Sequence, residues 1–265
     1  MSNKLPIIQS LWIGPTLTLN EQLCISSFLH HGHEFHLYCY DHIQGVPEGT
    51  IVKDANTVLS SDSIFQYHSG SYAGFADWFR WELLSKYGNF WVDTDVICVK
   101  PFQFSSEIIF GLEQNDLVCP AVIGFPKGHQ LCSFLANVCK NPFNPLPYDT
   151  KKKKRKKLKY RLLGRGREKI GWGEAGGPVG FTKALKYFNL YSQAQSHLAF
   201  FPISPLHWDT IYDRTFENES IDLFTNTYAI HLWNEMSRRK QGFDKNDRYY
   251  SSSLIEKLRA KYLGI

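Results

Sequence analysis

Two aspartates stand between two strongly apolar segments, and this arrangement constrains the fold more than any other stretch. Asp93 and Asp95 follow the apolar residues 90–92 and precede a second apolar run, residues 96–99. Carboxylates next to apolar strands are costly to bury unless they are paired, protonated or bound to a cation. Oxygen ligands suit Mg²⁺ or Mn²⁺, so a divalent metal is one interpretation. An ordinary polar turn between two strands is the other.

A helical pattern precedes the aspartates and ends in the turn Tyr87-Gly88-Asn89. Asp77 and Arg80 lie three residues apart within it, so they share one face of the helix. A separate apolar stripe along the same segment is the side expected to face the core. We therefore predict a helix, a tight turn and a buried strand that ends at the aspartates. The alternative for Asp77 and Arg80 is a solvated ion pair, which contributes about 0.2–0.5 kcal/mol.

This stretch resembles the DXD-containing sugar-transferase family, which has a GT-A fold. The residues that carry the resemblance share one register and are Ala76-Asp77, Arg80, Leu84, Gly88, Asp93, Asp95 and Pro101. The family includes bacterial capsule and lipopolysaccharide transferases, α1,4-galactosyltransferases and yeast-type α-mannosyltransferases, and more distantly the clostridial glucosylating toxins. Asn89 stands where the family usually has a second glycine. Because Asn tolerates positive φ better than most residues, we expect the turn to be kept.

Two further segments are similar to the family near the donor substrate. Trp12 ends an apolar N-terminal run with Trp-Ile-Gly, and the resemblance implies that it stacks on the nucleotide base. A core tryptophan is the alternative. Gly177-Pro178 matches a small-residue segment that precedes a helix and would lie against the donor sugar. The alternative is a glycine-rich turn with proline at the first helical position, which proline favours.

The run at residues 228–234 looks like the C-terminal signature of the galactosyltransferase branch. Its histidine, His231, is a candidate third metal ligand, because imidazole binds borderline metals well. Trp233, through its indole N–H, and Asn234 are candidates for contact with the diphosphate. A histidine satisfied within the core is the alternative for His231.

The resemblance implies a metal-dependent retaining glycosyltransferase. Asp95 and His231 would hold Mn²⁺ or Mg²⁺, and Asp93 would bind the metal through water or hold the ribose. Asp77 and Arg80 would bind the hydroxyls of the donor sugar, and these two residues with both aspartates make up the predicted catalytic set. The implied donor is a nucleotide sugar, with a UDP-hexose favoured. The implied acceptor is a saccharide or a lipid-linked saccharide in surface polysaccharide or lipopolysaccharide synthesis.

The order of the remaining predicted elements indicates an α/β fold. A strand at residues 4–14, a helix at 20–31 and a strand at 34–40 are typical of the opening of a nucleotide-binding sheet. Further strands and helices are expected at residues 108–110, 117–119, 121–125, 129–139, 181–187 and 251–263. We predict one GT-A type domain over residues 1–265, with a Rossmann-like mixed sheet flanked by helices.

The cysteines and the N-terminal sequence favour a cytoplasmic protein, either free or peripheral on the inner face of the membrane. The six cysteines form no CxxC pair and mostly lie in apolar runs, which is typical of reduced core residues. The first ten residues do not resemble a signal peptide, and no apolar run approaches 18 residues.

Residues 151–169 carry a net charge of +11 against a total of +5, so the rest of the chain carries −6. Because dense like charge opposes packing, we predict a mobile basic loop at about residues 147–171. It is either a solvated loop, a contact with an anionic membrane surface or a contact with nucleic acid. Interleaved leucines favour the membrane, and the acidic remainder makes nucleic acid unlikely.

Two other functions remain open at this point. One is a protein of the same fold that binds nucleotide or carbohydrate without catalysis. The other, less favoured, is a nucleic-acid-binding protein that uses the basic segment and whose binding weakens steeply with salt.

Overall fold

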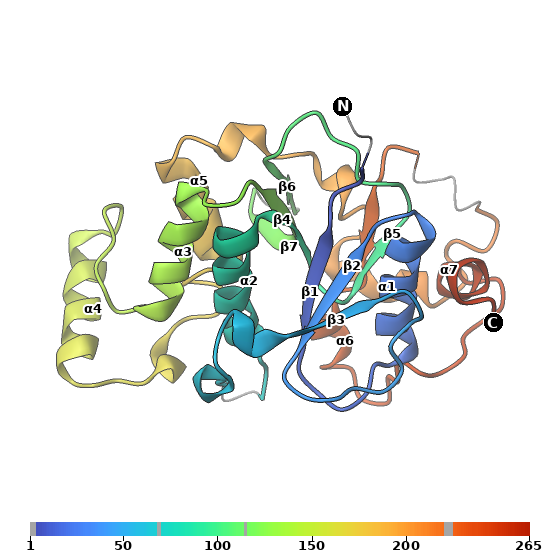
Figure 1. Cartoon of the computed structure of the whole chain (residues 1–265), viewed down its shortest axis with the longest axis horizontal. Coiled ribbons are helices and arrows are strands. Elements are labelled where there is room, and N and C mark those ends of the chain that lie inside the picture. The colour runs from blue at the N-terminus through green and yellow to red at the C-terminus, as the bar shows by residue number, and fades with distance from the viewer. Residues whose placement is uncertain (1–3, 68–69, 114–115, 220–224) are drawn as a thin grey trace.

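The computed structural model describes residues 4–67, 70–113, 116–219 and 225–265, and these form two sheets with helices on both sides (Figure 1). The strands are β1 Ile8–Trp12, β2 Phe35–Cys39, β3 Ile51–Asp54, β4 Asn89–Val92, β5 Val96–Cys98, β6 Ile109–Leu112, β7 Val118–Phe125 and β8 Ala229–His231. The α-helices are α1 Leu19–His30, α2 Ala73–Tyr87, α3 Gln130–Lys140, α4 Lys151–Leu162, α5 Pro178–Tyr187, α6 Asn234–Ser237 and α7 Leu254–Leu263.

The larger sheet has the strand order β3-β2-β1-β4-β7-β6. The first four strands are parallel, whereas β7 runs antiparallel to both β4 and β6. The predicted α/β class, a mixed sheet flanked by helices, is confirmed. From β1 the chain adds β2 and β3 on one side, and it then returns to place β4 on the other side of β1. The strand order therefore reverses at β1, and ligands bind beyond the strand ends at such a switch point.

Side chains that alternate along the strands build a core on each face of this sheet. Phe90 and Val92 of β4 pack with α1, α7 and the smaller sheet, whereas Trp91 packs on the opposite face with α2, α3 and α5. This alternation is the period of two expected of a strand buried on both faces. Figure 1 shows the two helix layers on either side of the sheet. Each of the six cysteines is buried and free, as predicted.

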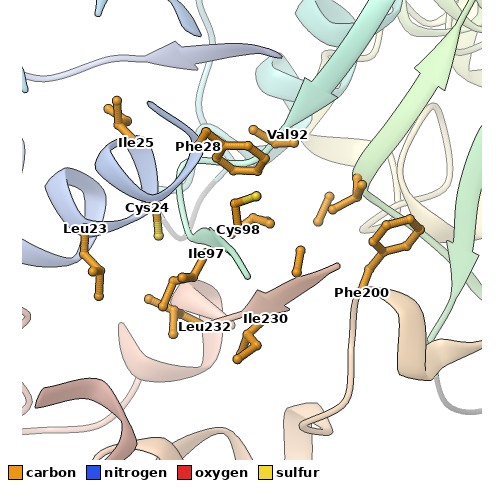
Figure 2. Close-up of a cluster of buried hydrophobic side chains, with 14 of the residues drawn as sticks. Leu23, Cys24, Ile25, Phe28, Val92, Ile97, Cys98, Phe200, Ile230 and Leu232 are labelled. Carbon is orange, nitrogen blue, oxygen red and sulfur yellow. The ribbon is translucent and has the colours of Figure 1, made fainter. Parts of the chain in front are cut away.

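The smaller sheet is an antiparallel pair of β5 and β8. Its residues Ile97, Cys98 and Ile230 pack against Cys24 and Phe28 of α1 (Figure 2). This burial holds two short strands that would not be stable alone. The packing therefore holds β8 against β5, the strand that directly follows Asp93 and Asp95.

The turn before β4 forms as predicted. Gly88 and Asn89 both have φ of 67°, in the left-handed region where glycine and asparagine are the favoured residues. A Cβ atom on Gly88 would lie 2.4 Å from the backbone nitrogen of Lys127. The glycine therefore serves both the turn angle and the close approach of a neighbouring chain segment.

The two strands predicted around Pro120 are a single strand, β7. The β6–β7 register shifts between Phe110 and Gly111, so that Gly111 pairs with Cys119 and Phe110 with Ile123. Pro120 lies in this irregularity. The regular ladder is interrupted there, so the lack of an N–H on proline costs no hydrogen bond. Its carbonyl is consequently available to a side chain, which the site uses.

The basic segment was predicted as a loop, and the structure has a helix there instead. Lys and Arg are good helix formers, and α4 begins with the Thr150 hydroxyl accepting a hydrogen bond from the Lys153 N–H at 3.2 Å. Lys157 is buried and pairs with Asp149 at 2.7 Å, which offsets part of the repulsion. Within the described residues, no helix is long and apolar enough to cross a bilayer.

Candidate active site

A cleft of about 550 Å³ opens where β1 and β4 end. Trp12 is the last residue of β1 and Asp93 follows β4, so the cleft occupies the switch point of the sheet. Every predicted site residue except Gly177 lines it, namely Trp12, Asp77, Arg80, Asp93, Asp95, Pro178, His231, Trp233 and Asn234.

Three of the predicted metal ligands meet in this cleft. One ligand atom from each of Asp93, Asp95 and His231 lies within 4.8 Å of the others. Strand pairing produces this convergence, because Val96 of β5 stands opposite His231 of β8. The backbone N–H of Leu232 also donates to the carbonyl of Asp95 at 2.8 Å. Residues far apart in sequence are thus fixed by backbone hydrogen bonds.

The carboxylate of Asp95 is held from two sides. Its Oδ2 accepts a hydrogen bond from the backbone N–H of Asn234 at 2.8 Å and lies 3.2 Å from Nε2 of His231. Burial alone would raise the pKa of Asp95, but His231 and the Asn234 N–H lower it to about 2. Burial would likewise lower the pKa of His231, and the Asp95 carboxylate instead raises it well above its usual value. The pair is therefore an ion pair at neutral pH.

Asp93 belongs to a second set of contacts, centred on Arg80. Its Oδ1 lies 3.1 Å from Nη2 of Arg80 and accepts a hydrogen bond from the indole N–H of Trp91 at 2.7 Å. Arg80 donates to the carbonyl of Pro120 at 2.7 Å and lies over the Trp91 ring. Burial raises the pKa of Asp93, Arg80 opposes the rise, and the charge of Asp95 adds to it.

Asp77 completes this set on the α2 side. It is buried, and its Oδ1 lies 3.5 Å from Nη2 of Arg80. Burial raises the pKa of Asp77 to about 6, with Arg80 opposing and Asp93 adding to the rise. A Cβ atom on Gly177 would lie 2.7 Å from Oδ2 of Asp77. The predicted Gly177-Pro178 segment therefore abuts the predicted sugar-binding carboxylate, and the side-chain-free glycine permits the contact.

The predicted contact between the Trp233 N–H and a diphosphate does not fit the structure. Trp233 is buried with φ of 55°, and its indole N–H donates to the carbonyl of Ile203 at 2.8 Å. The turn at this residue directs the following N–H, that of Asn234, to Asp95. The Asn234 amide donates to Glu21 at 3.1 Å, and its Oδ1 is buried without a hydrogen-bond partner among the described residues.

Trp12 lies in the wall of the cleft rather than in the middle of the core. The residue is half-buried, and its ring packs at the margin of the core beside α1. Its Nε1 is enclosed, and within the described part of the chain it has no hydrogen-bond partner. A Cβ atom on Gly14 would lie 3.3 Å from that nitrogen. This position is compatible with the predicted contact with a nucleotide base.

Several residues of the cleft were not predicted from the sequence. Glu113 lines it directly after β6, and burial raises the pKa of this carboxyl group. The strand was predicted only over residues 108–110, so the sequence did not place Glu113 at a strand end. Trp172, Glu235 and Arg239 also line the cleft, and they lie in segments without a periodic pattern.

The donor set of Asp93, Asp95 and His231 fits a divalent cation. Two carboxylates and an imidazole suit Mn²⁺, and the carboxylates alone suit Mg²⁺. Burial is the main cause of the raised pKa of Asp93, and the charge of Asp95 adds a repulsion that a cation would relieve. A cation at Nε2 of His231 would replace the proton that this nitrogen shares with Asp95.

Comparison with known proteins bears on the kind of enzyme that the chain resembles. Residues 181–262 match a family model described as the alpha 1,4-glycosyltransferase conserved region. The chain therefore resembles the glycosyltransferases, as predicted. The matched residues include His231 and Asn234, whereas Asp93 and Asp95 lie outside them.

No curated protein matches this chain. Among solved structures, 41 chains match. One of them, titled PaToxG glycosyltransferase, has 14% sequence identity and a TM-score of 0.47, over 98% of this chain and 87% of that one.

Proposed function

We propose that this protein is a metal-dependent, retaining hexosyltransferase that uses a nucleotide sugar, with a UDP-hexose favoured as donor. The acceptor is a saccharide or a lipid-linked saccharide, as in the synthesis of surface polysaccharide or lipopolysaccharide. The carrying observation is that Asp93, Asp95 and His231 meet in one cleft beside the Asp77–Arg80 pair. We further propose a single domain over residues 1–265, located in the cytoplasm or on the inner face of the membrane.

Asp95 and His231 would hold Mn²⁺ or Mg²⁺ directly, and Asp93 would contribute through water or bind the ribose. When bound, the cation would neutralise the diphosphate of the donor as it becomes the leaving group. The chain itself orients Asp95, through the hydrogen bond from the Asn234 N–H. A preoriented carboxylate costs less reorganisation on binding.

Asp77 and Arg80 would bind the hydroxyls of the donor sugar. Arg80 is fixed by the Pro120 carbonyl and by Trp91, so its guanidinium presents a rigid face to the cleft. Gly177 keeps the α5 end of the cleft free of side-chain atoms next to Asp77. Trp12, across the cleft at the end of β1, would stack on the nucleotide base.

The reaction class follows from the resemblance, which implies retention of the anomeric configuration. The bond between C1 of the hexose and the diphosphate oxygen breaks, and the acceptor oxygen bonds to C1 on the same face. The proton of the acceptor hydroxyl passes to the leaving phosphate. The residues of the chain hold the donor and exclude water from C1.

The proposal is tested by thermal shift with UDP-glucose, UDP-galactose, UDP-N-acetylglucosamine and GDP-mannose, each with and without Mn²⁺. A ligand that binds the folded state raises the melting temperature. We expect a UDP-sugar to do so in a Mn²⁺-dependent manner, and to be hydrolysed slowly without an acceptor. Metal-dependent binding without any turnover would instead indicate a non-catalytic nucleotide-binding protein.

A further inference from the structure

The basic helix α4 lies at the edge of the molecule, apart from the large sheet (Figure 1). It contacts the rest of the chain through a stripe of polar residues spaced four apart and through Tyr160, whose ring lies edge-on to that of Phe143. Lys153 lies 3.5 Å from Glu174, Lys157 lies 2.7 Å from Asp149, and Arg161 donates to Asn144 at 3.1 Å. The side of α4 that faces the protein is therefore mostly polar.

The leucines of α4 point the other way. Leu158 and Leu162 are one turn apart, and their exposed fractions are 41% and 77%. The next residue, Leu163, is 53% exposed. A helix on the surface of a globular protein normally turns its apolar residues toward the core. In α4, by contrast, two leucines one helical turn apart face solvent, and a third follows at the end of the helix.

Exposed basic side chains surround this stripe. Lys151, Lys154, Arg155 and Lys159 are all exposed on α4. The first turn of the helix consists of four lysines, and cations at a helix N-terminus oppose the helix dipole. An anionic surface would offset the charge of these lysines, and it would also bury the exposed leucines. Leucines framed by lysine and arginine are the composition of helices that lie in a membrane interface.

We propose that α4 docks this protein on an anionic lipid bilayer, with Leu158, Leu162 and Leu163 inserted at the level of the headgroups. Charge complementarity selects this partner, since a neutral surface would leave the surrounding cations unpaired. The docking surface goes beyond the proposed catalytic function. The suggestion that docking brings the cleft to a lipid-linked acceptor is the one part that rests on the proposed catalytic function.

The connection between α4 and the cleft is short. Glu174, the partner of Lys153, is separated by a single residue from Trp172, which is exposed and lines the cleft. Tryptophan is favoured at membrane–water interfaces. A helix docked at this place would therefore hold the mouth of the cleft close to the bilayer.

Sedimentation with phosphatidylcholine vesicles, with and without phosphatidylglycerol, tests the proposal. We expect binding only to the anionic vesicles, and weakening at high salt. Leu162→Asp should reduce the binding by about tenfold, because an inserted leucine is replaced by a charge. Leu206→Asp is the matched control, because Leu206 is 78% exposed and lies outside α4. Equal binding of the two variants would overturn the proposal.

A second pair of variants tests the charges. Lys154→Gln combined with Arg155→Gln should weaken binding to anionic vesicles by about 25-fold, since each basic residue contributes about fivefold. Lys127→Gln combined with Lys183→Gln removes two exposed cations elsewhere and should have a smaller effect. Binding to a homopolymeric RNA without binding to vesicles would assign α4 to nucleic acid and overturn the proposal.

The docking and catalytic proposals fail separately. Asp95→Ala should bind anionic vesicles as the wild type does. Leu162→Asp should keep Mn²⁺-dependent donor binding and transfer to a soluble saccharide. Loss of vesicle binding in Asp95→Ala would show that docking does not depend on α4 alone, and would contradict the proposal.

Discussion

Asp95 and Asp77 face the same cleft, and the chain holds them in different ways. Asp95 is tied to the backbone of the β5–β8 region, through the N–H of Asn234 and its own carbonyl. Asp77 and Asp93 are instead held by side chains, both by Arg80 and Asp93 also by the indole N–H of Trp91. We name these the metal half and the arginine half of the site. The first half is held by backbone hydrogen bonds, whereas the two carboxylates of the second share a single guanidinium, so one substitution can dismantle it.

Removal of Asp95 should have the largest effect. Asp95→Ala deletes the partner of His231 and the acceptor of the Asn234 N–H, and should lower transfer by about 10³-fold. Mn²⁺ binding, measured by calorimetry, should be lost in parallel. Asp62→Ala, an exposed aspartate in a short 3₁₀ segment, is the control. Full activity in Asp95→Ala would end the assignment of a metal half.

Arg80→Ala breaks the arginine half. It leaves Asp77 and Asp93 without their cation, so we expect a loss of about 3 kcal/mol in the free energy of unfolding. The ratio kcat/KM should fall by about 10²-fold, while Mn²⁺ affinity changes less than in Asp95→Ala. Lys86→Ala removes an exposed cation from the same helix and should be near neutral. Equal loss of Mn²⁺ affinity in Arg80→Ala would show that the two halves act as one.

Glu21 tests whether the metal half is preoriented from behind. This buried glutamate lies 2.6 Å from Lys245 and accepts from the Asn234 amide, and Asn234 in turn orients Asp95. Glu21→Gln should weaken Mn²⁺ binding by about tenfold, the usual effect of a residue behind a metal ligand. Glu256→Gln is the control, because Glu256 is also buried and ion-paired but contacts Arg259. Equal effects on Mn²⁺ affinity would reduce Glu21 to a general structural role.

The two halves should respond to acid with opposite sign. The pKa of Asp77 is raised to about 6, so the folded state takes up a proton before the unfolded state does, and acidification from pH 7 to 5 adds about 1 kcal/mol of stability. The pKa of Asp95 is lowered to about 2, so its stabilisation is lost below about pH 4. Urea unfolding of the wild type and Asp77→Asn measures the first effect. If the wild type gained no more unfolding free energy than Asp77→Asn between pH 7 and 5, the predicted role of Asp77 in this pH dependence would be contradicted.

The local part of the site could be predicted from sequence, since the helix, turn and strand around Asp77 and Asp93 follow from short-range patterns. The pairing of β5 with β8 could not, because three-residue strands carry little periodicity. His231 was reached by resemblance only. The Trp233 contact was predicted wrongly, since the carbonyl of Ile203 comes from a distant segment with no regular pattern. Helix α4 was not predicted, because the prediction considered only the repulsion among its lysines and arginines. The Thr150 cap and the Lys157–Asp149 ion pair, which favour the helix, were not considered.

The β5–β8 pairing also has a consequence for synthesis of the chain. Residues 96–98 leave the ribosome long before residues 229–231, their hydrogen-bonding partner. Until then the edge of β5 is an unpaired template, of the kind that invites misassembly. The edge is protected only once β8 has been made and pairs with it, and the same pairing brings His231 beside Asp95.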